Sequence, residues 1–166
     1  MASGPQDLED RQGFVRLAAS AQLRADADRV AAMLADGSPS WLGERVQGGP
    51  DHLRRYAVDL RLRVGGDNAG LTTFGKAAFL DVGSPVQTPD GWEVEIGWRA
   101  STAAPLFPVF AGRLLIGDGV LSLEGLYAPP GGVIGRVADR ILLHVAANGT
   151  ALWLLAEVER AAMVGR

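Results

Sequence analysis

The chain has 166 residues, of which 48% are hydrophobic, and a formal net charge of −3. This length suits one folded domain, since a chain of this size buries roughly 70% of its unfolded surface without needing cross-links. The slight acidic balance argues against nucleic-acid binding, which normally shows a basic surplus. The sequence contains no cysteine, which excludes disulfides and thiolate metal sites.

The first residues are polar and acidic, so residues 1–11 are predicted to form a flexible tail and residues 12–166 a single domain. The tail lacks the basic start and apolar run of a secretory signal. The most apolar stretch, 146–156, is too short to span a bilayer. We therefore expect a cytoplasmic protein with no stable membrane insertion. With two histidines and no suitably spaced carboxylates, we expect no metal and no cofactor.

The pattern changes from strand to helix within the first 46 residues. Apolar residues roughly alternate over 13–23, which is typical of a strand. Over 27–34 they recur at three- and four-residue steps behind Asp26, a suitable N-cap, and this predicts a short amphipathic helix. Ser38 followed by Pro39 predicts a second short helix over 39–46.

The middle of the chain predicts an antiparallel meander. Over 53–64, apolar residues alternate with Arg55, Asp59 and further arginines, so one face is expected in the core and the charged face in solvent. Four more strands, making six in all, are predicted at 71–82, 92–99, 107–116 and 120–127. The step Gly117-Asp118-Gly119 predicts a hairpin between the last two.

A long helix is predicted over 133–163. At about 100° per residue, one broad apolar face contains Ile134, Val137, Ala138, Ile141, Val145, Leu152 and Leu155. Gly149 lies inside this helix and predicts a bend or a close approach of another element.

The sequence between the last strand and this helix carries a family resemblance. Residues 125–140 read GLYAPPGGVIGRVADR: a strand ending in Gly-x-Tyr-x-Pro-Pro, a glycine-rich turn, and a helix that opens with Gly and Asp-Arg. This stretch, together with the order of elements over about 12–163, resembles the SRPBCC superfamily of START-related and polyketide cyclase-like proteins. The resemblance implies an α+β helix-grip fold. Its curved antiparallel sheet of six to seven strands would wrap a long C-terminal helix, with two short helices after the first strand.

The resemblance also implies an apolar cavity between sheet and helix, lined by aromatic side chains and a few polar ones. The candidate pocket residues are Trp41, Tyr56, Val58, Lys76, Trp92, Trp98, Phe110, Leu114, Tyr127, Ile141, His144 and Val145. Any one of the aromatic residues is more often plain core, and His144 is more often packing than a base. Lys76 has the same strand phase as Leu80. Its side chain points inward if this phase faces the core, and outward if the opposite phase, which contains Phe79, faces the core.

Two functions follow from these observations. The favoured one is binding or carrying a hydrophobic small molecule, lipid-like or polyketide-like, because the sequence shows no nucleophile motif and no pair of acid-base carboxylates. The alternative is a polyketide cyclase or aromatase-like enzyme that uses a few polar cavity groups, since members of the superfamily range from carriers to cyclases. The expected partner is an apolar ligand, and a homodimer is compatible with the sequence.

Overall fold

The computed structural model describes residues 14–36, 41–64, 72–101, 109–128 and 137–164, apart from the side chains of 61–64, 72–76 and 137–146. The elements, in chain order, are β1 (Val15–Gln22), α2 (Ala27–Ala35), β2 (Glu44–Val46), β3 (Arg54–Val64), β4 (Thr72–Val82), β5 (Val86–Thr88), β6 (Gly91–Ala100), β7 (Val109–Ile116), β8 (Val120–Ala128) and α3 (Val137–Val164).

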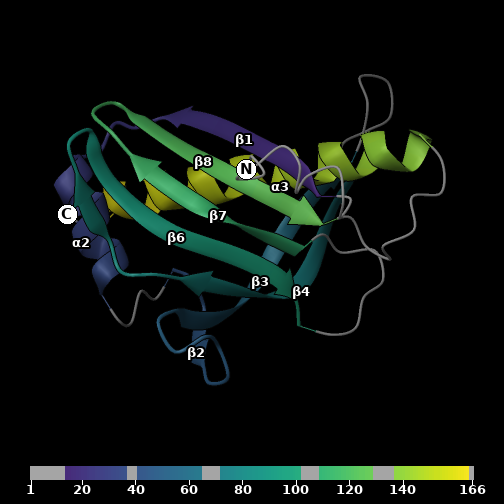
Figure 1. Cartoon of the computed structure of the whole chain (residues 1–166), viewed down its shortest axis with the longest axis horizontal. Coiled ribbons are helices and arrows are strands. Elements are labelled where there is room, and N and C mark those ends of the chain that lie inside the picture. Colours follow the sequence, from purple (N-terminus) through teal and green to yellow (C-terminus); the bar gives the residue numbers. More distant parts are fainter. Residues whose placement is uncertain (1–13, 37–40, 65–71, 102–108, 129–136, 165–166) are drawn as a thin grey trace, which may run out of the picture.

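The strands form one antiparallel sheet in the order β1-β8-β7-β6-β4-β3-β2, and β5 pairs with β6. This sheet lies in front of α3 in Figure 1. The helix lies closest to β3 and β1, which are near opposite ends of the sheet. The predicted architecture, a curved antiparallel sheet around one long C-terminal helix, is therefore confirmed.

The second predicted short helix is wrong. Trp41 and Leu42 form a turn, and Glu44–Val46 form a strand that pairs with β3, with Arg45 opposite Tyr56. Gly43 lies between turn and strand with φ of 107°, a conformation that favours glycine and does not continue a helix. Residues 37–40 lie outside the described residues.

The strand number also differs from the six counted in the sequence, since the described residues form a sheet of eight strands. The additional strands, β2 and β5, have three residues each. Such a strand is too short to show alternation.

The predicted helix at 27–34 is confirmed as α2. Asp26 caps it, since its carboxylate accepts a hydrogen bond from the backbone N–H of Arg29 at 3.1 Å. The other end is fastened to the sheet by Arg54. Its guanidinium donates to the carbonyl oxygens of Ala35 and Asp36, and also to those of Leu34 and Gly83.

The long helix is confirmed, but part of its predicted buried face is wrong. From residue 147 onward the buried side chains are Ala147, Thr150, Ala151, Leu154, Leu155, Val158 and Ala162. Leu152, which we placed on the buried face, is 44% exposed. The cause is that apolar residues surround most of this helix, so that periodicity alone does not select one side.

Candidate functional site

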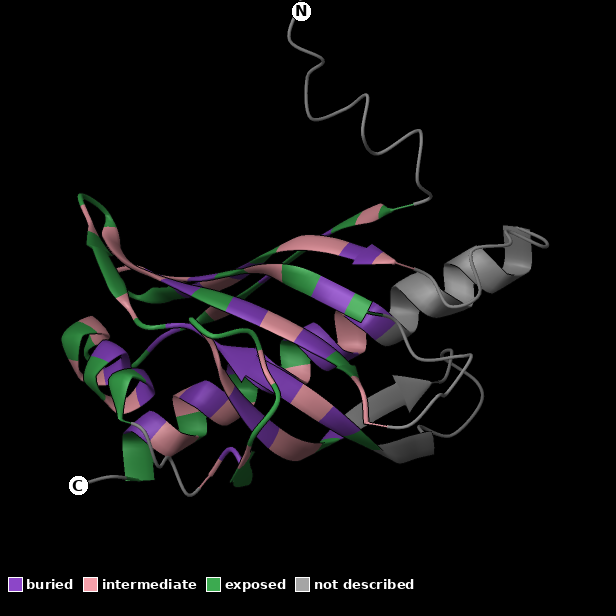
Figure 2. Ribbon diagram, turned by 60° about the horizontal axis from the view of Figure 1, so that its bottom comes forward, coloured by how far each residue is buried: buried purple, intermediate pink, exposed green. Residues whose placement is uncertain are grey.

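Large side chains form a row across the sheet on its buried face. The strand register places Tyr56 opposite Leu80, Leu80 opposite Trp98, Trp98 opposite Phe110, and Phe110 opposite Tyr127. All five are at most 2% exposed, and the alternation of buried and exposed positions along the strands can be followed in Figure 2. Directly opposed residues project to the same face, so these side chains form one continuous layer. We call it the aromatic row.

Phe110 and Trp98 stack within this row. Their ring centroids are 4.0 Å apart and their planes differ by 18°. Gly112 and Gly125 lie opposite each other, and a Cβ atom on either would lie 2.6–2.7 Å from Cζ of Phe110. These two interior glycines therefore leave the room that the Phe110 ring occupies.

Two polar atoms of the aromatic row are buried without a hydrogen-bond partner. They are the Tyr56 hydroxyl and Nε1 of Trp98, and Nε1 of the half-buried Trp41 is in the same state. A buried polar group without a partner costs about 1–3 kcal/mol. Nε1 of tryptophan can only donate, whereas the tyrosine hydroxyl can donate or accept. The described interior thus contains polar groups that nothing in the described chain uses.

The predicted pocket residues whose side chains are described divide into two groups. Val58 lies beside the aromatic row, where it pairs with Ala78. Leu114 and Trp92 lie toward α2; six residues along β6 separate Trp92 from Trp98, a distance of roughly 20 Å. The indole N–H of Trp92 donates to Asp28 of α2 at 2.8 Å, so this residue helps to hold α2.

The remaining predicted residues stay predictions. The side chains of Ile141, His144 and Val145 lie outside the described residues. The register places Lys76 opposite Leu60, in the phase of the buried Leu80, but the Lys76 side chain is also outside them.

Sequence patterns missed a buried ion pair on the outer face of the sheet. Arg55 donates from Nε and Nη2 to the two carboxylate oxygens of Asp81, at 2.7 and 2.8 Å, and from Nη1 to the carbonyl of Gly48. The two side chains are only 7% and 8% exposed, so the expectation of a solvated Arg55 is wrong. The segment around Gly48 covers this end of the face. Hydrogen bonding to Asp81 raises the pKa of Arg55, which keeps the guanidinium charged.

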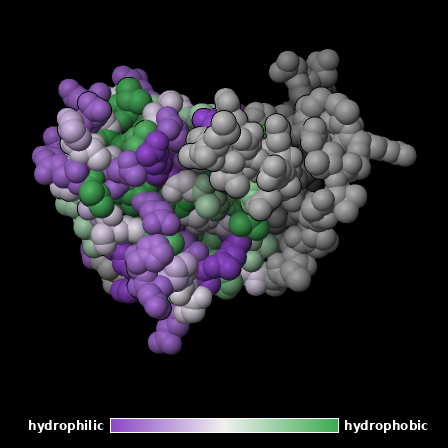
Figure 3. Space-filling model, in the orientation of Figure 1, coloured by the Kyte–Doolittle hydropathy of each residue, from purple (hydrophilic) through white to green (hydrophobic). Residues whose placement is uncertain are grey.

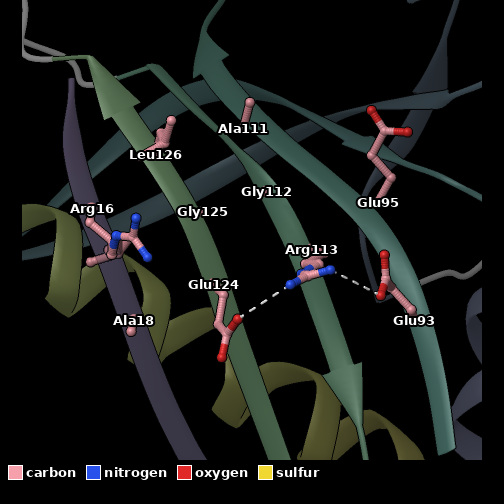
Figure 4. A pocket seen from close by; sticks show the side chains of 11 residues that line it. Arg16, Ala18, Glu93, Glu95, Ala111, Gly112, Arg113, Glu124, Gly125 and Leu126 are labelled. Atoms are coloured by element: carbon pink, nitrogen blue, oxygen red, sulfur yellow. Dashed lines mark hydrogen bonds and ion pairs between the residues drawn. The ribbon is translucent and has the colours of Figure 1, made fainter. Parts of the chain in front are cut away.

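The outer face also carries an open groove of about 760 Å³ across β1, β8, β7 and β6. Arg113 lies in it between Glu93, at 3.4 Å, and Glu124, at 3.8 Å, as Figure 4 shows. Small side chains such as Ala18 and Ala111 leave the hollow. Figure 3 shows polar and apolar groups interspersed on this side of the molecule. The groove is open and charged, and its lining contains no aromatic side chain, so it lacks the apolar enclosure typical of small-molecule sites.

The described residues were also compared with the requirements of a metal site and of a membrane-spanning helix. No group of three or more histidine or carboxylate side chains among them is placed to hold a metal ion. None of the helices in this part of the chain is both long and apolar enough to cross a membrane.

Comparison with known proteins supports the fold. No family model matches the sequence, and no curated protein does. The di-domain ARO/CYC protein BexL from the BE-7585A biosynthetic pathway has a similar structure: 13% identity and a TM-score of 0.53 over 97% of this chain and 54% of BexL. DynU16, a putative protein of the dynemicin biosynthetic locus, has 19% identity and a TM-score of 0.45 over 92% of this chain and 48% of DynU16. Ara h 8.0201 has 12% identity and a TM-score of 0.49 over 91% of this chain and 99% of Ara h 8.0201.

The chain thus spans about half the length of BexL and of DynU16. At this level of identity, the similarity to BexL concerns the fold alone. The sheet order, the gripped C-terminal helix and this similarity lead to one conclusion: the chain has the helix-grip fold, as its resemblance to the SRPBCC superfamily predicted.

Proposed function

We propose that this protein binds an apolar small molecule, lipid-like or polyketide-like, between the aromatic row and α3. The observation that carries the proposal is the row itself, in which Tyr56 and Trp98 present polar atoms without partners among large apolar surfaces. Sites for such ligands combine apolar and aromatic walls with a few polar groups that fix orientation. The lining of the outer groove contains no aromatic side chain.

The position of α3 also supports a binding site above the middle strands of the sheet. The helix lies closest to β1 and β3, so a ligand above the middle strands would leave the contacts at both ends of the sheet in place. The side chains of the aromatic row are at most 2% exposed. Entry of a ligand therefore requires these side chains, or part of α3, to move, and we expect association to be slow for this reason.

One observation favours the alternative, a cyclase or aromatase-like enzyme. The Tyr56 hydroxyl is buried and unpartnered, so it is able to exchange a proton with a bound ligand or to polarise a ligand oxygen. BexL is described as an ARO/CYC protein and has a similar fold, but one fold serves many functions. Binding without catalysis requires fewer groups and is the proposal we favour.

Native mass spectrometry tests the proposal. The protein is purified without detergent and measured directly, then after incubation with palmitic acid and, separately, with 2-acetylnaphthalene as an aromatic ketone. We expect a one-to-one complex with at least one of the two added compounds. If neither compound forms a complex and no small molecule is retained from the cell, the proposal is wrong.

A further inference from the structure

We propose that the ligand carries a carbonyl-type oxygen and a flat unsaturated body, and that Trp98 Nε1 and the Tyr56 hydroxyl bind this oxygen. This inference rests on the proposed function, because it assigns a ligand class to the same site. The proposed ligand class comprises aromatic or polyenic ketones and quinones. It does not include saturated acyl chains, because their hydrocarbon part has no hydrogen-bond acceptor.

Among the described residues, four buried side-chain atoms lack a hydrogen-bond partner: Nε1 of Trp41, Oε2 of Glu159, and the Tyr56 hydroxyl and Trp98 Nε1 of the aromatic row. On the same strand, the indole N–H of Trp92 finds Asp28, whereas Nε1 of Trp98 finds no partner. The Trp98 N–H only donates, so the missing group must be an acceptor. A saturated hydrocarbon ligand would leave the penalty of the unpaired donor in place, whereas an oxygen would remove it.

Tyr56 and Trp98 flank one position of the sheet. Tyr56 and Trp98 occupy one register row, with Leu80 of β4 between them, so their backbones lie two strand spacings apart, roughly 10 Å. Both side chains project from the same face of the sheet, on either side of Leu80. One ligand oxygen, or two oxygens on one ring system, can therefore meet both groups.

The stacked pair sets the expected shape of the ligand body. Trp98 lies against Phe110 with nearly parallel rings, which holds the indole in one orientation. The Phe110 ring is itself held over Gly112 and Gly125. A planar unsaturated ligand makes more contact with such flat surfaces than a flexible chain does, and loses less conformational freedom on binding.

The experiment compares two probes of nearly equal shape, 2-acetylnaphthalene and 2-isopropenylnaphthalene, which differ in a carbonyl oxygen against a methylene. Affinities are measured by equilibrium dialysis for the wild type, Tyr56→Phe and Trp98→Phe, with Trp92→Phe as the matched control. We expect Tyr56→Phe and Trp98→Phe each to weaken binding of the ketone roughly three- to tenfold. Tyr56→Phe should change binding of the hydrocarbon less than twofold. Trp98→Phe also alters the stacked pair, so it should weaken binding of the hydrocarbon too, but less than binding of the ketone. Trp92→Phe should change neither.

Thermal unfolding provides a second measurement that does not depend on the ligand. Tyr56→Phe removes a hydroxyl without a partner, so its Tm should equal or exceed that of the wild type. Since this variant is expected to fold, the test stands even if Trp98→Phe does not fold.

The outcomes separate the two proposals. If both probes bind and Tyr56→Phe weakens them equally or not at all, the assigned ligand class is wrong and the proposed function stands. If neither probe binds the wild type, the assigned ligand class is wrong. If palmitic acid also fails to bind and no small molecule is retained from the cell, the proposed function is wrong as well.

Discussion

Arg55 is a buried charged group that points away from α3 and donates from all three nitrogen atoms of its guanidinium. It lies on the outer face of β3, buried against Asp81, with Arg99 at 3.5 Å from the same carboxylate and the Phe79 ring 5.2 Å from its guanidinium carbon. Alternation along β3 correctly placed this face opposite the core. It could not show that the segment at Gly48 covers the face, because a covered charged face and a solvated one have the same pattern.

Asp81→Asn is expected to destabilise the protein by about 3 kcal/mol, because it leaves Arg55 as a buried charge without its counter-ion. The loss is measured as the change in the free energy of unfolding in urea. Glu124→Gln is the matched control, since Glu124 pairs with Arg113 at an exposed site and should lose less than about 1 kcal/mol. Equal losses for the two variants would show that Arg55 and Asp81 are not buried as described.

At the scale of elements, the sequence predicted the long strands and missed the short ones. Strands β3, β4, β6, β7 and β8 each have at least eight residues, long enough for alternation to show. The short strands β2 and β5 were not predictable in this way. The face of α3 failed for another reason: leucines lie on several sides of the helix, and only its position against the sheet decides which of them is buried.

The helix face is tested by one substitution at two positions of α3. Leu155 is 0% exposed and Leu152 is 44% exposed, although the sequence placed both on one face. Leu155→Ala should cost about 3 kcal/mol of unfolding free energy, because it leaves a cavity in the core. Leu152→Ala should change it by no more than about 0.5 kcal/mol. Urea unfolding of both variants checks this, and a larger loss for Leu152→Ala would contradict the described orientation of α3.

At the scale of the molecule, the fold brings together residues that the sequence presented only as separate candidates. Tyr56, Trp98, Phe110 and Tyr127 come from four strands and meet in one row because the register aligns them. Strand phase predicted that Tyr56, Trp98 and Tyr127 face inward. It could not predict the register across the sheet, so Trp92 and Leu114, which share the phase of Trp98, appeared equally suited to the site although they lie toward α2.

The sequence also could not predict which buried polar atoms lack a hydrogen-bond partner. A sequence names the tyrosines and tryptophans but does not say which of them finds a partner, since that depends on the element packed opposite. Trp92 meets Asp28 and Trp98 meets no acceptor among the described residues. The difference between these two residues of one strand carries the proposed site.

The most direct measurement is a two-dimensional proton–nitrogen NMR titration of the ¹⁵N-labelled protein with 2-acetylnaphthalene. The chain has four tryptophans, so four indole N–H signals are expected, and single Trp→Phe variants assign them. Binding between the aromatic row and α3 should shift the Trp98 signal strongly and leave the Trp92 signal, held by Asp28, unchanged. Shifts confined to the backbone amides of Ala111 and Arg113, in the outer groove, with an unmoved Trp98 signal would contradict the account.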